Sequence, residues 1–410
     1  DADRGRRRGA RAAGRRSMIE LRGTTWDHPR GLGGVSAVAE AYGRARPDVR
    51  VSWEVRSLQA FADHPVERLA ERYDLIVLDH PSVGEAATAG GLVPLDAHLD
   101  ADYLDEQRRS SVGPSAQSYA WDGRVWALAI DAAAQVATYR PDLLERCDAE
   151  VPRTWDDVER LAERARTVGS WVAFPAISVD AILAFLAICV ALGEEPCAGP
   201  EAVVGRGVGR DALATMGRVV AASHPESTGW NPPTMLERMS TTDEVVYCPL
   251  AFGYLNYARD GFRPHVVHGA PGPAGLDGSP RGTLGGAGLA VSSLRPNVEH
   301  AVGFAASVAA PGMQRTAYVE GGGQPGHRTA WLDPAVNASC NSFLADTLPG
   351  LDAAYLRPRH AGFLAFQDAG GDLVHAWLRD GAGADADDVL DALDERWRAS
   401  RPVGAMRGSR

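Results

Sequence analysis

The feature that most constrains this fold is an alternation of strand patterns and helix patterns between residues 18 and 89. The strand patterns occupy residues 18–25, 49–55 and 75–78. The helix patterns, with apolar residues at helical spacing, occupy residues 33–46, 66–72 and 82–89. Strands that are separated by helices pair in parallel, so this stretch predicts a doubly wound α/β sheet. In the common strand order 2-1-3, the first and third strands are neighbours.

The first and third strand patterns both run into the tripeptide Asp-His-Pro. Asp27-His28 follow the first strand and Asp79-His80 follow the third. Such sheets bind ligands beyond the carboxyl ends of their strands, so both pairs are predicted to form one polar rim of a ligand site. Two alternatives remain open: the Asp and Pro begin the next helix, or two Asp and two His hold a metal. A third copy, Asp63-His64-Pro65, opens a helix without following a buried strand.

Composition excludes several classes of function. The 410 residues exceed one ordinary core and predict two domains. The net charge of the chain is -11, but residues 1–17 hold seven Arg and two Asp and carry +5. Residues 18–410 therefore carry -16, which argues against nucleic acid as the main binding partner. The Arg-rich tail is predicted to be disordered. The chain has no lysine, which excludes Schiff-base chemistry and a P-loop. Five cysteines without a C-x-x-C pair predict free thiols.

A series of short motifs follows in a characteristic order. They are Ala87-Thr-Ala-Gly-Gly-Leu-Val-Pro-Leu95, Asp122-Gly-Arg-Val-Trp-Ala-Leu-Ala129, the segment 136–144, the segment Pro152–Asp157 with an N-cap at Thr154, and Gly285–Ser292. Together they resemble the extracellular solute-binding proteins of ABC transporters, in the sugar-binding family that includes maltose-binding protein. The resemblance covers most of residues 18–330 and is weakest near 270–280 and beyond 335.

The resemblance implies a two-lobed periplasmic-binding-protein-like fold of type II, in which each lobe is a doubly wound α/β sheet and a multi-crossing hinge joins them. Lobe one would hold residues 18–130 and 287–325, and lobe two residues 131–286 and 326–410. A monomer would deliver its ligand to the membrane subunits of an ABC transporter, without a cofactor. The family is periplasmic or at the cell surface; no signal-peptide pattern is visible, so a cytoplasmic location stays open.

A closing cleft needs aromatic faces and a few fixed polar groups. The candidates are Trp26, Asp27, His28, Asp79, His80, Asp131, Tyr254, Tyr257, Gly286 and Gln324. Trp171, Phe174 and Phe252 are also possible but are more typical of core packing. Arg357, Arg359 and His360 either hold an anionic ligand or form salt bridges to the acidic body.

Function is predicted to be binding rather than catalysis, because no signature of a nucleophile with its base or of a metal site occurs. The ligand would be a sugar, a related polyol or an organic acid. One alternative is an enzyme on the same fold, a thiaminase-like transferase or hydrolase, for which Cys248 is the cysteine nearest the expected cleft. The other alternative is a cytoplasmic ligand sensor.

Overall fold

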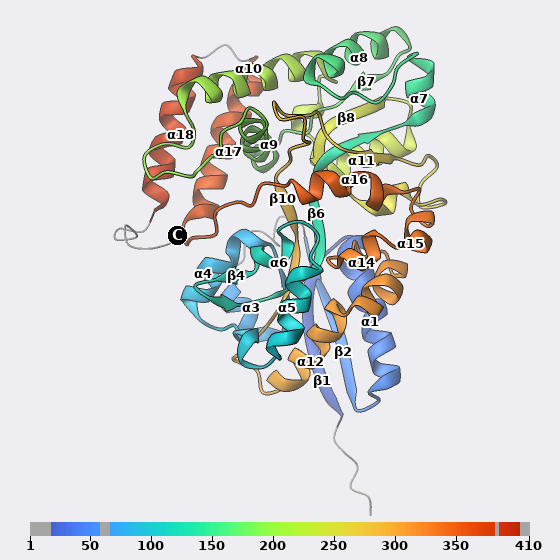
Figure 1. Cartoon of the computed structure of the whole chain (residues 1–410), viewed down its shortest axis with the longest axis vertical. Helices are drawn as coiled ribbons and strands as arrows, with labels where there is room; N and C mark the ends of the chain where they lie inside the picture. Colours follow the sequence, from blue (N-terminus) through green and yellow to red (C-terminus); the bar gives the residue numbers. More distant parts are fainter. Residues whose placement is uncertain (1–17, 58–65, 382–384, 402–410) are drawn as a thin grey trace, which may run out of the picture.

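The computed structural model describes residues 18–57, 66–381 and 385–401, which form two α/β lobes stacked along the long axis (Figure 1). The predicted two-lobed α/β fold class is confirmed. The predicted tail of residues 1–17 and the third tripeptide, Asp63-His64-Pro65, lie outside the described residues. Within the described ranges, no helix combines the length and the apolar character that a membrane crossing needs.

Lobe one is built on the predicted alternation of strands and helices. Its elements are β1 (Ile19–Trp26), α1 (Pro29–Ala45), β2 (Val49–Arg56), α3 (Val66–Arg72), β3 (Leu75–Leu78) and α4 (Val83–Ala89). The strands pair in parallel in the order β2-β1-β3. The prediction that the first and third strands are adjacent is therefore confirmed. The carboxyl ends of β1 and β3 therefore lie side by side at the edge that faces lobe two (Figure 1).

Two long strands connect the lobes. The sequence pattern predicts one strand that ends at Asp131 and another over residues 135–139; this was wrong, because β6 (Leu128–Tyr139) is continuous through Asp131. It pairs antiparallel with β10 (Leu284–Val291), and Ala287 lies opposite Asp131. The strand order is β2-β1-β3-β10-β6-β8-β7, with β9 also on β6, so one sheet runs through both lobes.

Lobe two surrounds its part of the sheet with helices. Its strands are β7 (Trp171–Val172), β8 (Val245–Phe252) and β9 (His268–Ala270). Its helices are α7 (Pro141–Arg146), α8 (Trp155–Thr167), α9 (Ser178–Ala191), α10 (Arg206–Ala222), α11 (Pro232–Thr241), α17 (Phe363–Arg379) and α18 (Ala386–Ser400). The predicted cap of α8 is confirmed, because Thr154 and Asp157 bond reciprocally in a capping box. Helix α9 is buried over nearly its whole length.

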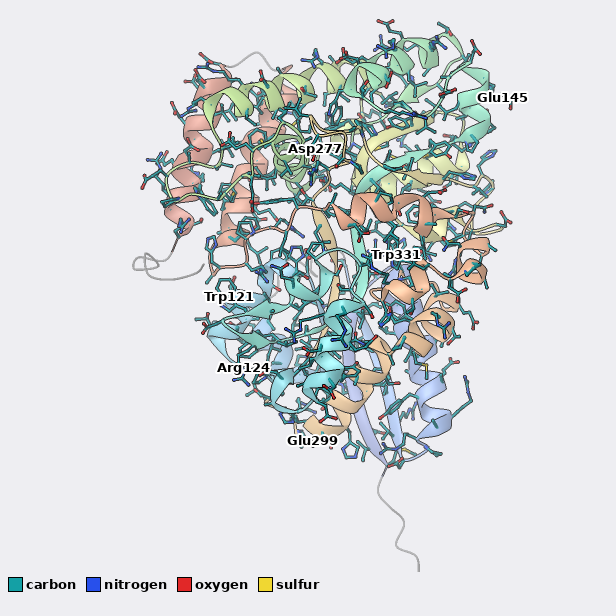
Figure 2. The ribbon with its side chains drawn as sticks, viewed as in Figure 1. Trp121, Arg124, Glu145, Asp277, Glu299 and Trp331 are labelled. Carbon is teal, nitrogen blue, oxygen red and sulfur yellow. The ribbon has the colours of Figure 1, made fainter. Side chains whose placement is uncertain are left out.

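The remaining elements complete lobe one and the junction between the lobes. They are α5 (Ala101–Arg109), α6 (Ser115–Ser118), β4 (Ala120–Trp121), β5 (Arg124–Val125), α12 (Val298–Ala309), α13 (Pro311–Met313), α14 (Arg328–Trp331), α15 (Pro334–Ala338) and α16 (Phe343–Asp352), with short 3-10 and π turns between them. Trp331 lies buried at the level where the lobes meet (Figure 2) and packs in one cluster with Ala132 of β6. The predicted sequence limits of the lobes stay predictions.

All five cysteines are buried and carry free thiols, as predicted. In the described ranges, no three side chains of His, Cys, Asp or Glu gather as they would around a metal ion.

Candidate functional site

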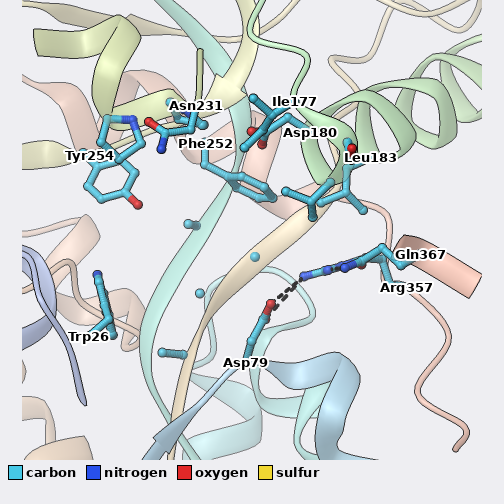
Figure 3. Close-up of a pocket in the computed structure, with 18 of the residues that line it drawn as sticks. Trp26, Asp79, Ile177, Asp180, Leu183, Asn231, Phe252, Tyr254, Arg357 and Gln367 are labelled. Atoms are coloured by element: carbon cyan, nitrogen blue, oxygen red, sulfur yellow. Dashed lines mark hydrogen bonds and ion pairs between the residues drawn. The ribbon is translucent and has the colours of Figure 1, made fainter. Parts of the chain in front are cut away.

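A cavity of about 630 Å³ lies between the lobes, where β6 and β10 cross. Both lobes and both crossing strands supply its wall (Figure 3). The lining residues are Trp26, Arg30, Asp79, Asp131, Ala133, Ile177, Ser178, Val179, Asp180, Leu183, Asn231, Pro232, Pro233, Phe252, Tyr254, Gly285, Gly286, Ala287, Arg357, Gln367, Asp368 and Asp372.

Three aromatic side chains belong to the apolar part of the wall. Trp26 is the last residue of β1, while Phe252 ends β8 and Tyr254 follows it. Trp26 and Tyr254 lie on the same side of the cavity, and Phe252 extends across its upper part in this view (Figure 3). The rings thus give the cavity flat apolar surfaces from both lobes, the arrangement on which the apolar face of a small polar ligand can stack.

A buried ion pair connects the first helix to the hinge. Arg30, in the first turn of α1, donates from Nε to Asp131 Oδ2 at 2.8 Å, and its Nη2 binds Asp131 Oδ1. Its Nη1 donates to the Gly253 carbonyl oxygen of lobe two at 2.9 Å, and its guanidinium lies 4.6 Å from the centre of the Tyr254 ring. Burial alone would lower the pKa of Arg30, but the charge and hydrogen bonds of Asp131 outweigh it and raise that pKa. Arg30 therefore ties lobe one to both the crossing strand and lobe two.

A second ion pair spans the cavity between Asp79 and Arg357. Asp79 follows β3 of lobe one, and Arg357 Nη2 lies 3.3 Å from both of its carboxylate oxygens (Figure 3). Arg357 also donates from Nη1 to Gln367 Oε1 of α17 at 2.7 Å. Burial would raise the pKa of Asp79, but Arg357 and the hydrogen bonds from His80 lower it to about 2. Of the two interpretations of Arg357 from the sequence, anion binding or a salt bridge to the acidic part of the chain, Arg357 forms the salt bridge.

The opposite wall is the first turn of α9. Asp180 projects from this turn near Asn231 and Phe252 (Figure 3), and only 5% of its surface is exposed. Asp372 of α17 lies beside the same turn, where its Oδ1 accepts a hydrogen bond from Ser178 Oγ at 2.6 Å. Burial raises the pKa of the Asp180 carboxyl to about 8. Asp180 and Asp372 make this wall acidic.

The structure brings five of the ten predicted site residues to the cavity: Trp26, Asp79, Asp131, Tyr254 and Gly286. The single rim of two Asp-His pairs does not form, because of those four residues only Asp79 lines the cavity. Asp27 is exposed outside the lining. His80 is fully buried within lobe one, where burial and Arg357 lower its pKa to about 4, so it does not titrate between about pH 5 and 8 as the sequence suggested.

The other three candidates have structural contacts near the cavity. His28 is the N-cap of α1: its Nδ1 accepts the Arg30 amide hydrogen at 3.0 Å, and its ring lies 4.8 Å from that of Tyr254. Burial and nearby arginines lower its pKa to about 4. Tyr257 is buried behind Tyr254. Gln324 joins the lobes, because its Nε2 donates to the Ala132 carbonyl oxygen at 2.7 Å and its Oε1 accepts from the Leu255 amide at 3.0 Å.

Sequence reasoning missed several lining residues, chiefly Arg30, Asp180, Asn231 and Asp372. Arg30 directly follows the first Asp-His-Pro, so its place near the carboxyl end of β1 could have been predicted from the sequence. Asp180 is the one charged residue in the largely apolar segment 176–192, and a charged residue in such a segment indicates a functional role. Phe252, interpreted from sequence as core, packs on core residues and also faces the cavity.

The sequence and the fold of the chain are both similar to those of known proteins. The family model described as "Bacterial extracellular solute-binding protein" matches residues 26–176. The sequence signature of these proteins is thus found in residues 26–176. No curated protein matches the chain significantly by sequence.

Solved solute-binding proteins share the fold over most of this chain and nearly all of their own. Maltose-bound MalE3 of T. maritima aligns over 93% of this chain and 99% of its own, with 20% identity and a TM-score of 0.80. The solute-binding protein of Agrobacterium radiobacter K84 in complex with ribitol aligns over 93% and 99%, with 18% identity and a TM-score of 0.77. The maltotriose-bound protein of Thermus thermophilus aligns over 93% and 99%, with 17% identity and a TM-score of 0.70.

Proposed function

We propose that this protein captures a sugar or polyol between its two lobes and delivers it to the membrane subunits of an ABC transporter. The observation that carries the proposal is the cavity at the crossing strands, whose lining combines aromatic rings from both lobes with carboxylate and amide groups. Polyhydroxylated ligands suit such a wall, because their C–H faces stack on rings and their hydroxyl hydrogens are donated to carboxylates. The solved relatives bind maltose, ribitol and maltotriose.

The charges of the wall favour a sugar or polyol over an organic acid. Five aspartates line the cavity: Asp79, Asp131, Asp180, Asp368 and Asp372. The two lining arginines, Arg30 and Arg357, are already paired with Asp131 and Asp79. A carboxylate ligand would therefore enter a site with excess negative charge and find both cations engaged.

The crossing strands support capture by closure. Residues on both sides of the β6–β10 ladder line the cavity, so a ligand that contacts all of them favours the arrangement in which the lobes are close together. Arg30 and Arg357 already link the lobes across this region. A membrane complex that recognises the closed lobes would then act on the loaded protein.

The alternative that this protein is an enzyme is not supported by the environment of Cys248, its expected nucleophile. Cys248 lies in β8, is fully buried, and is not part of the cavity wall. Burial raises the pKa of its thiol to about 12, so the reactive thiolate is disfavoured at neutral pH. We infer a binding protein that acts at the cell surface or in the periplasm, as a monomer, over both the enzyme and the cytoplasmic sensor.

A thermal-shift screen tests the function. The purified chain is heated with sugars, polyols and carboxylates in turn, and each hit is titrated by calorimetry. At a concentration one hundred times its dissociation constant, the true ligand adds roughly 2.7 kcal/mol to the free energy of unfolding. Stabilisation by a sugar or polyol is expected. Stabilisation by carboxylates alone, or steady conversion of a hit into product, would contradict the proposal.

A further inference from the structure

The charges of the cavity are balanced on one wall and unbalanced on the other. Arg357 neutralises Asp79, and Arg30 neutralises Asp131. Among the ion pairs formed by the described residues, none includes Asp180 or Asp372. The wall formed by α9 and α17 therefore presents acidic groups whose charge no arginine of the cavity offsets.

Asp180 is buried without a partner. In the described part of the chain, its Oδ2 is out of contact with solvent and has no hydrogen-bond donor. Its neighbours on the wall include the apolar side chains of Ile177, Leu183 and Phe252 (Figure 3). An unpaired carboxyl in such a place is costly, and sites retain such groups where a ligand supplies the missing partner.

Close helix packing holds a second carboxylate at the same place. Gly371 of α17 lies so near the Ser178 carbonyl that a Cβ atom added there would be 2.3 Å from its oxygen. This contact places Asp372 beside the first turn of α9, where Ser178 Oγ binds it. The same turn that carries Asp180 thus positions a second acidic group at the cavity.

We propose that the ligand is a sugar or polyol that carries a protonated amino group, and that Asp180 is the residue that selects it. The proposal rests on the function proposed above and names the chemical class of its ligand. A neutral hydroxyl can form a hydrogen bond with the protonated Asp180 carboxyl but cannot stabilise its charged carboxylate form. An ammonium supplies both the donor and the charge, and it gains further from the faces of Phe252 and Tyr254.

The ammonium competes with a proton for Asp180. Because burial raises the pKa of this carboxyl to about 8, the empty cavity holds it largely protonated at pH 7. Binding of a cation favours the carboxylate and releases that proton. A cationic ligand is therefore expected to release close to one proton per molecule bound at pH 7, and a neutral ligand none.

Matched ligand pairs test the proposal. Glucose is compared with glucosamine, and sorbitol with 1-amino-1-deoxysorbitol, by calorimetry at pH 7 in two buffers that differ in ionisation enthalpy. The amino member of at least one pair is expected to bind tenfold or more tightly and to release a proton. In Asp180→Asn both the preference and the proton release should vanish. In Asp122→Asn, a change in an exposed turn residue, both should remain.

The outcomes separate this inference from the function on which it rests. If the neutral members, or other neutral sugars, bind as well as the amino members or better, the amino specificity is wrong and sugar capture stands. If neither the pairs nor the wider sugar and polyol panel bind, both proposals fall. Asp180→Asn keeps the size of the protonated carboxyl and should fold, so an unchanged preference in this variant would also refute the proposal, whatever the second variant, Asp372→Asn, shows.

Discussion

Replacing Arg30 by methionine should destabilise the protein in a pH-dependent way. Arg30 is 4% exposed and Asp131 is 0% exposed, so water cannot replace the lost guanidinium beside the carboxylate. The variant must then keep an unpaired buried charge or protonate Asp131. Protonation at pH 7 costs about 1.4 kcal/mol for each pH unit above an ordinary carboxyl pKa of about 3.9, or roughly 4 kcal/mol. Losing the hydrogen bond to the Gly253 carbonyl adds about 1 kcal/mol.

The sign of the pH dependence follows from the state of Asp131. In the variant its folded-state pKa lies above the unfolded value, so folding is penalised progressively as the pH rises above about 4. The loss relative to wild type should therefore shrink by more than 1 kcal/mol per pH unit as the pH falls from 7 to 5. In the wild type, burial still raises the pKa of Asp131, but the charge and hydrogen bonds of Arg30 oppose that rise, so this contribution is smaller.

Urea titrations followed by tryptophan fluorescence at pH 7 and pH 5 measure both effects. The matched control is Arg22→Met, which removes an ion pair to Glu54 whose partners are both nearly half exposed; its midpoint should change little at either pH. The double variant Arg30→Met, Asp131→Asn should recover most of the loss, because no charge is left to bury. A loss that is the same at both pH values, or no recovery in the double variant, would refute the reasoning.

Three further changes probe the cleft and the hinge. Trp26→Ala should weaken sugar binding at least tenfold in calorimetry, about 1.4 kcal/mol, whereas Trp121→Ala, at the surface of lobe one (Figure 2), should leave it unchanged. Gly286→Ala should lower the free energy of unfolding by more than about 1 kcal/mol, because Gly286 has a φ of 104° and an added Cβ would lie 2.4 Å from the Asp131 carbonyl oxygen. Gly207→Ala, in open space on α10, should be neutral or stabilising. Cys248→Ala should leave ligand affinity unchanged, and a ligand conversion that disappears in this variant would contradict a binding role.

The sequence predicted the arrangement of lobe one because its signals are local. The apolar run of β3 and the helical spacing of α1 each depend on adjacent residues, and their alternation is enough to specify parallel pairing. The continuity of β6 was not predicted, because the residues on either side of Asp131 read as two strands. The pairing of β6 with β10 and with β8 is what shows that residues 128–139 form one strand and that this strand enters both lobes.

The site was predicted where backbone position alone decides it. Asp79 and Trp26 lie at the ends of adjacent strands, so the strand order places them at the cavity. His80 and His28 follow the same strands, but the turn that starts each helix directs them elsewhere. Asp180 and Arg357 enter the site through packing between segments far apart in the chain, and no local pattern encodes that closeness.

The place of β10 in the sheet has a consequence for how the chain acquires its structure. β10 lies between β3 and β6, although more than 140 residues separate it from either strand in sequence. During synthesis, β3 and β6 emerge first and expose unpaired edges until residues 284–291 arrive. Neither lobe can close its sheet from the first two thirds of the chain, so folding is dominated by late, long-range pairing and should be slow. A fragment that stops before β10 would expose both edges to other chains and should aggregate.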